Sequence, residues 1–242
     1  MKVRASLNKQ IFSMIGQMKI LLSAAVFLAA AVLSGSDFNQ LVQEASKLVR
    51  AKDYAGAEAR YAEAMQAART SAQKCKAVEG RYQAMVSQKK WKGSEAFMTM
   101  EIEEDEMLRP QELRRLVNIF AGTYLWSGRA DFAMSLLQQA QSLPCPTYSN
   151  EFYCTYDYMA HLYLHRKLPH PAIEVMRNVL RVRDLHPANA HGAHVLTARA
   201  YEMLGRNQDA LRHYRAALDY GRKVQYKFDY STAEKAIRRL SK

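Results

Sequence analysis

Two pairs of histidines have the spacing that places side chains on one face of a helix, where they could bind a metal. His161 and His165 are four residues apart, and His191 and His194 are three apart. Neutral imidazole is a common zinc ligand, and residues three or four apart are neighbours on a helix. A metal-binding protein that uses these helical pairs is therefore one hypothesis. The alternative is that the imidazoles pack or are solvated, since no HExxH motif accompanies either pair.

Other sequence motifs that are typical of catalytic or cofactor-binding sites are missing. It has no Gly-rich phosphate loop, no G-x-S-x-G nucleophile elbow and no C-x-x-C pair. These motifs supply the nucleophiles, phosphate sites and redox pairs of many enzymes. We therefore predict that the protein is not an enzyme and needs no cofactor.

Two of the three cysteines lie close together in the sequence. Cys145 and Cys154 flank the step between two expected helices at 130–142 and 151–166. In an oxidising compartment these thiols could pair, and closing so short a loop would stabilise the fold by roughly 2–3 kcal/mol. The alternative is two reduced thiols. Cys75 is the remaining cysteine, and we expect it to be buried.

Residues 1–36 have the features of a secretory signal peptide. The apolar run Ile20–Leu33 has 14 residues without a charge, which is short for a membrane span of about 20 residues. Basic residues precede the run and small residues follow it, as in a cleavable signal. Met1 and Met18 are both suitable starts. We expect the exported chain to begin near Asp37 and to keep no membrane span, the alternative being an uncleaved anchor or a buried helix.

The charge balance limits the choice of partner. The chain has 35 lysine and arginine residues against 23 acidic residues, a net charge of +12. Residues 1–36 carry four of these bases and no acid, which leaves +8 on the exported part. The bases are spread along the chain without an RNA-binding motif, which argues against a nucleic-acid partner. We expect a protein of the periplasm or cell envelope, where an acidic polymer or a lipid surface would be the counterpart of this charge. The expected partner is a protein or peptide with acidic groups.

One spacing pattern recurs along the chain. Tyr201, Gly205, Ala210, Tyr214 and Ala217 lie at offsets 0, 4, 9, 13 and 16. The same offsets hold three further sets of residues: Tyr124, Gly128, Ala133, Leu137 and Ala140; Tyr163, Lys167, Ala172, Met176 and Val179; and Leu48, Lys52, Ala57, Tyr61 and Ala64.

This spacing predicts two amphipathic helices joined by a tight turn. The residue at offset 4 ends the first helix, where glycine takes a positive φ without a clash. The alanine at offset 9 lies where the two helices approach closely, and offsets 13 and 16 share one helical face. One hairpin cannot bury its own apolar face, so such units stack in arrays. A fifth unit, within 72–107, matches approximately, with Trp91 and Ala96 near their places and Tyr82 one turn out of phase.

These units resemble the tetratricopeptide repeat family, whose helix–turn–helix unit has about 34 residues. The resemblance implies an all-α fold, a right-handed α-solenoid of about five helical hairpins, in a single domain over 37–242. The expected units span 38–71, 72–108, 111–145, 150–186 and 189–222, followed by a capping helix at 229–241. Counted from the recurring pattern, the last three units start near 114, 153 and 191, which are 39 and 38 residues apart. None of the units has the family's tryptophan near the start of its first helix.

The resemblance also implies a function. Proteins of this family are interaction scaffolds that hold a peptide or partner protein in a groove. The first helix of each unit lines that groove at its second, fifth, ninth, twelfth and thirteenth positions. In this sequence those positions hold Arg115, Asn118, Gly122, Leu125 and Trp126; Cys154, Asp157, His161, Leu164 and His165; and Gly192, Val195, Arg199, Glu202 and Met203.

Two of these residues indicate what the groove would bind. His161 and Arg199 share the ninth position in successive units, so we expect them to be neighbours that favour an acidic group on the ligand. Two alternatives remain open for the surface: its side chains are only solvated, or the C-terminal helix fills the groove. A structural spacer within an envelope complex is the remaining alternative for the protein as a whole.

Overall fold

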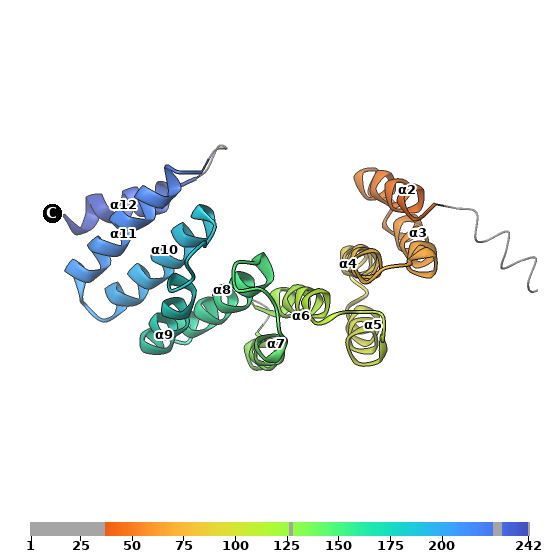
Figure 1. Ribbon diagram of the computed structural model, residues 1–242, viewed down its shortest axis with the longest axis horizontal. Helices are drawn as coiled ribbons and strands as arrows, with labels where there is room; N and C mark the ends of the chain where they lie inside the picture. Colours follow the sequence, from red (N-terminus) through yellow and green to blue (C-terminus); the bar gives the residue numbers. More distant parts are fainter. Residues whose placement is uncertain (1–36, 126–127, 225–228, 242) are drawn as a thin grey trace, which may run out of the picture. The chain divides into compact units, whose positions relative to one another are not determined.

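The structure, a computed structural model, describes residues 37–125, 128–224 and 229–241. These residues form eleven helices and no strand (Figure 1). The expected signal peptide at 1–36 and the expected groove residue Trp126 lie outside the described residues. The all-α fold class expected from the sequence is confirmed.

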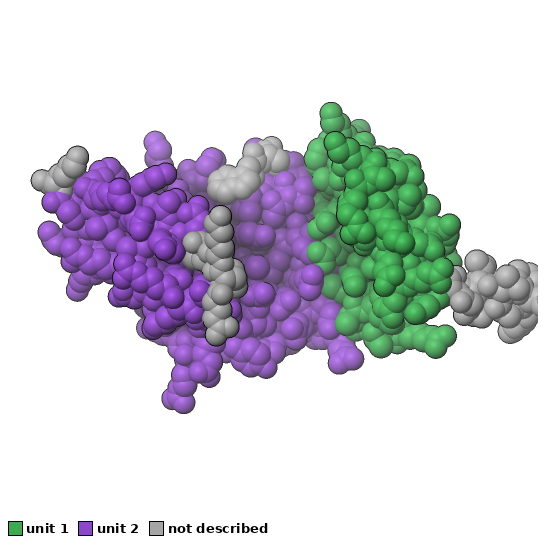
Figure 2. All heavy atoms as spheres, turned by 90° about the horizontal axis from the view of Figure 1, so that it is seen from above, with its two compact units in different colours: residues 1–93 green, residues 94–242 purple. Residues whose placement is uncertain are grey.

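The helices group into two compact units, which Figure 2 shows in different colours. The first unit ends at Gly93 and the second begins at Ser94. The sequence predicted a single repeat domain over 37–242. That the two units behave as one domain in solution stays a prediction.

The described residues of the first unit contain three complete helices. The helices α2 (Phe38–Arg50) and α3 (Tyr54–Ala67) form a hairpin, and α4 (Ser71–Ser87) packs against α3. An aspartate or threonine side chain caps each N-terminus by accepting a hydrogen bond from a backbone N–H group that has no partner within the helix. The core cluster of this unit is small and apolar: Phe38, Leu41, Val42, Ala45, Ala57, Tyr61, Ala64, Ala68, Ala77 and Ala84.

The helix α5 (Trp91–Glu104) crosses the boundary between the units. The second unit continues with α6 (Pro110–Tyr124), α7 (Ala130–Ser142), α8 (Asn150–His165), α9 (Pro169–Leu180), α10 (Pro187–Met203), α11 (Asn207–Gly221) and α12 (Ser231–Leu240). Proline is the first residue of α6, α9 and α10, where its missing N–H group would have had no helical partner. The helices pair as α6 with α7, α8 with α9 and α10 with α11, and α12 packs on α11 as the expected capping helix.

Five turns between successive helices contain a described residue with a positive φ. These residues are Lys52 (61°), Lys89 (60°), Gly128 (77°), Lys167 (60°) and Gly205 (69°). At four of the turns the next N–H group donates a hydrogen bond to the carbonyl five residues earlier, as from Arg206 to Tyr201 at 2.9 Å. This bond is that of a Schellman cap, which ends the first helix and fixes the direction of the chain. The positive φ expected at Gly128 and Gly205 is confirmed.

The structure corrects the register of the second repeat. The positive φ at Lys89 marks offset 4, so Ser94 takes offset 9 and Glu101 takes offset 16. Ser94 and Glu101 are buried, whereas Ala96 is exposed. The expected match at Ala96 was wrong because a serine and a glutamate occupy the two positions that hold small or apolar residues elsewhere.

The alanines at offset 9 of the other repeats are core residues. Ala57, Ala133, Ala172 and Ala210 have no exposed surface. A small residue at this position allows two helical backbones to approach closely, as the spacing predicted. The repeated pattern therefore reflects how the helices pack against each other. It places no requirement on the residue types of their exposed faces.

Gly205→Val tests the backbone constraint at the turn. A side chain at Gly205 would meet no other atom within 4 Å, so any cost comes from the positive φ itself. We expect the free energy of unfolding to fall by about 1–2 kcal/mol, because a β-branched residue is strained in the left-handed region. Urea unfolding of the variant measures this loss.

Lys167→Gly is the matched control for this prediction. It removes a side chain from a positive φ at the same offset of the preceding repeat. We expect its stability to be unchanged or higher by up to about 1 kcal/mol. An unchanged unfolding midpoint in Gly205→Val would show that the turn imposes no such constraint.

Candidate interaction surface on α8 and α10

The expected groove residues of the second unit lie on the first helix of each hairpin. These helices are α6, α8 and α10, and α8 contacts both of the others (Figure 1). Side chains at equivalent positions of these helices therefore lie near one another.

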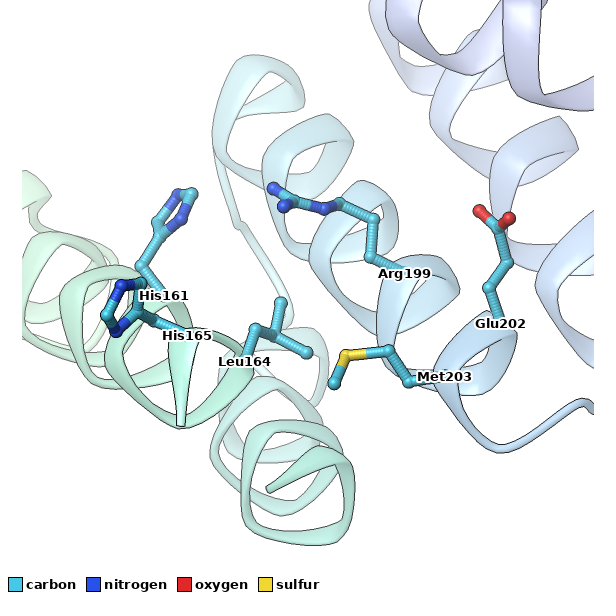
Figure 3. Close-up of a pocket in the computed structure, with 6 residues that line it drawn as sticks. All are labelled: His161, Leu164, His165, Arg199, Glu202 and Met203. Carbon is cyan, nitrogen blue, oxygen red and sulfur yellow. The ribbon is translucent and has the colours of Figure 1, made fainter. Parts of the chain in front are cut away.

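A pocket of about 310 Å³ opens between α8 and α10. It is lined by His161, Leu164 and His165 of α8 and by Arg199, Glu202 and Met203 of α10 (Figure 3). These six residues hold the ninth, twelfth and thirteenth positions of two successive repeats, which the resemblance assigned to the groove. Figure 3 shows the Arg199 side chain extending toward His161, so the expected proximity of these two residues is confirmed.

His161 belongs to a chain of polar contacts along α8. Its Nε2 atom is 3.8 Å from a carboxylate oxygen of Asp157, and the Tyr153 hydroxyl donates a hydrogen bond to Asp157 at 2.8 Å. Burial raises the pKa of Asp157, although His161 and Tyr153 partly offset that effect. Burial lowers the pKa of His161, Asp157 opposes this shift, and Arg199 adds to it. The imidazole is therefore mainly neutral at pH 7, next to a permanent cation.

The two charged residues of α10 have different surroundings. Glu202 accepts a hydrogen bond from the Tyr214 hydroxyl at 2.5 Å and one from the Arg239 guanidinium. Figure 3 shows its carboxylate on the far side of Arg199 from His161. Arg199 is exposed and makes no hydrogen bond or ion pair with any other described residue. The pocket therefore presents one cation whose donors are available and one carboxylate that is already bonded.

The part of the expected groove on α6 differs from the prediction. Asn118 is buried, donates a hydrogen bond to the Glu151 carbonyl at 2.9 Å and accepts one from the Thr155 hydroxyl at 3.0 Å. Leu125 is buried as well. Because both side chains are buried, their assignment to an open groove was wrong. Arg115 is exposed, as the prediction requires.

Two glycines of the expected groove lie under tyrosines of α8. A Cβ atom at Gly192 would stand 2.1 Å from the Tyr153 hydroxyl oxygen, and one at Gly122 would stand 3.2 Å from the Tyr158 ring. The glycine at 192 thus makes room for the tyrosine that holds Asp157. The surface on both sides of α8 depends on these close approaches.

Arg114 is a buried cation that the sequence reasoning missed. It is 3% exposed, and it donates hydrogen bonds to the Thr155 hydroxyl and to the Leu143 carbonyl, both at 2.9 Å. Its guanidinium also lies over the Phe152 ring, 5.5 Å from the centroid. These contacts join α6 to α8 and to the end of α7. Residue type alone could not distinguish it from its exposed neighbour, Arg115.

The chain is similar in structure to several solved proteins. A protein described as YrrB, a TPR protein with an unusual peptide-binding site, is 17% identical, with a TM-score of 0.53 over 84% of this chain and 92% of that chain. PilF of Pseudomonas aeruginosa is 13% identical, with a TM-score of 0.57 over 84% and 88%. A TPR protein of Thermus thermophilus is 15% identical, with a TM-score of 0.51 over 85% and 100%.

The chain has a tetratricopeptide-repeat fold. At these identities the similarity establishes the fold and leaves the partner open. No protein-family profile matches the sequence, and no curated protein matches it either. The function of this tetratricopeptide-repeat chain must therefore be argued from its own side chains.

The helical histidine pairs do not form a metal site among the described residues of the repeats. Nδ1 of His191 lies 2.8 Å from the Ala217 carbonyl oxygen, whereas Nδ1 of His194 lies 2.9 Å from Nδ1 of His213 on α11. No group of three His, Cys, Asp or Glu side chains converges in the part of the chain that the structure describes. A structural zinc site takes four ligands and a catalytic one takes three. The described geometry gives no support to the metal hypothesis.

The cysteines of the repeats are thiols in the structure. Cys145 and Cys154 are free and partly exposed, and Cys75 is buried, as expected. Burial raises the pKa of Cys154 to about 11, and the nearby Asp157 and Glu151 add to the shift. Cys154 is therefore a weak nucleophile at neutral pH. The alternative of a Cys145–Cys154 disulfide stays a prediction for the oxidised protein, which thiol titration tests.

None of the helices in the described residues is long and apolar enough to span a membrane.

Acidification should weaken the contact between α10 and α11. One imidazole of the His194–His213 pair must donate and the other must accept, so protonation of both breaks the bond. Burial, with His213 and His191, lowers the pKa of His194 from 6.5 to about 4, and burial with Arg212 also lowers that of His213. The unfolded chain therefore binds more protons, and stability is lost as the pH falls from about 6.5 toward about 4.

Unfolding at pH 7 and pH 4.5 measures this effect. His213→Asn should lose less stability between the two pH values than the unaltered chain, since one titrating partner is gone. The exposed His170 on α9 provides the control, and His170→Asn should keep the full loss. Equal losses in both variants would contradict the assignment.

Proposed function

We propose that the chain is a non-enzymatic adaptor of the cell envelope that binds an acidic segment of a peptide or partner protein across α8 and α10. The observation that carries this proposal is the pocket whose six lining residues come from equivalent positions of two successive repeats. The tetratricopeptide-repeat fold supports a role in protein interaction. The similar protein YrrB is described as having a peptide-binding site.

The charges around the pocket support an acidic ligand. Arg199 has an available planar guanidinium, which can donate two parallel hydrogen bonds to one carboxylate. Glu202 is already bonded to Tyr214 and Arg239, so it opposes an acidic ligand less than a free carboxylate would. Leu164 and Met203 supply apolar contact beside these charges. Together they match a segment with an acidic group next to an apolar one.

The place of action is proposed from the sequence alone. The run Ile20–Leu33, the basic residues before it and the small residues after it support export through a secretory signal. The partner would then be a component of the periplasm or cell envelope. Capture of partners on the chain beginning at Asp37, from the envelope fraction of its own cells, is the experiment that identifies this component.

Arg199→Glu should weaken binding of the captured partner by about 5–30-fold, corresponding to about 1–2 kcal/mol. The variant replaces the available cation of the pocket with a carboxylate that repels an acidic ligand. Arg215→Glu is the matched control, because Arg215 is an exposed residue of α11 outside the pocket and the change in net charge is the same. Titration calorimetry measures both affinities, and circular dichroism checks that both variants are folded. Equal affinities for the two variants would refute the proposed surface.

Binding should also strengthen as the pH falls from 7.5 to 6. His161 is mainly neutral in the unbound pocket because burial and Arg199 lower its pKa. An acidic group bound beside it would favour the imidazolium, so binding takes up a proton. The pH dependence should disappear in His161→Asn and persist in His170→Asn. A pH dependence that is the same in both variants would contradict this role of His161.

A further inference from the structure

A second pocket lies on the other side of Arg199, against the capping helix. It has a volume of about 400 Å³, and its lining includes Arg199 and Glu202 of α10, Tyr214 of α11, and Lys235 and Arg239 of α12. Arg199 and Glu202 line the first pocket as well. The two pockets therefore meet at these two residues of α10.

The capping helix is held against α10 and α11 by packing and by one ion pair. Ala233 and Ala236 of α12 are buried in a cluster with Ala198, Ala210 and Tyr214. On the pocket side, Arg239 donates a hydrogen bond to Glu202. Of the two alternatives for the groove, α12 does not fill the α8–α10 pocket: none of its residues lines that pocket.

The charges of the second pocket do not balance. Arg199, Lys235 and Arg239 are cations, and Glu202 is the only carboxylate among the described residues that line it. Arg239 and Tyr214 engage that carboxylate. Lys235, like Arg199, makes no hydrogen bond or ion pair with another described residue, although its charge helps to lower the pKa of Asp229. Two available cations from different helices thus face one hollow.

We infer that α12 is part of the binding surface and that the ligand is an acidic peptide segment with two acidic groups, one on each side of Arg199. One group lies in the α8–α10 pocket, and the other lies between Arg199 and Lys235. This inference rests on the proposed function, and it adds the second subsite and the number of acidic groups. The Arg199 guanidinium has five N–H donors, which are enough to bond to both acidic groups. Lys235 supplies a second positive charge to the acidic group that lies against α12.

The test uses a defined probe, a fluorescent hexaglutamate peptide blocked at both ends, with a hexaglutamine peptide as its neutral counterpart. The chain beginning at Asp37 should bind hexaglutamate and not hexaglutamine. Lys235→Glu should weaken hexaglutamate binding about fivefold or more in low salt, and added salt should reduce the difference. Arg238→Glu is the control: Arg238 is on the same helix, pairs with Glu234 and does not line the pocket.

The outcomes separate this inference from the proposed function. If Arg199→Glu weakens binding while Lys235→Glu and Arg238→Glu have equal affinities, the α12 subsite is wrong and the α8–α10 site stands. If neither Arg199→Glu nor Lys235→Glu differs from its control, both proposals fail. Weaker hexaglutamate binding in both Lys235→Glu and Arg199→Glu, with unchanged binding in the controls Arg238→Glu and Arg215→Glu, supports the two-subsite surface.

Discussion

The hairpins α2–α3, α8–α9 and α10–α11 each reverse direction at one residue with a positive φ, and the packing of both helices depends on that reversal. The Schellman-type bond ends the first helix at a fixed point, so the second helix returns at a fixed angle. The alanines at offset 9 can then lie where the backbones approach, with no exposed surface. With that geometry repeated, equivalent positions of α8 and α10 come together, and His161 and Arg199 face a common pocket.

The sequence was most informative at positions where the backbone conformation or the packing allows few residue types. Gly128, Gly205 and the buried alanines identified the hairpins because few residues satisfy a positive φ or a close approach. Lys52, Lys89 and Lys167 take the same turn geometry without glycine, so the turn is harder to recognise by residue type. The second repeat was misaligned because Ser94 and Glu101 are buried at positions where the pattern expected small or apolar residues.

The candidate site was predictable only in part. Position within a repeat places a side chain on the correct helical face, which was enough for the six residues of the α8–α10 pocket. It does not say whether the next helix covers that face, and Asn118 and Leu125 are covered. Nor does it reveal pairing across helices, such as Glu202 with Arg239 of α12. Such pairing decides which charges remain available for a ligand, and it follows from tertiary packing rather than from local pattern.

Hydrogen–deuterium exchange of the chain beginning at Asp37, with and without the partner that it captures, tests the central claim most directly. The account predicts that the partner slows exchange in α8, α10 and α12, which supply all the lining residues of the two pockets except Tyr214 of α11, and leaves α9 nearly unchanged. Protection confined to α7, α9 and α11 would contradict it, because the partner would then bind the second helices of the hairpins.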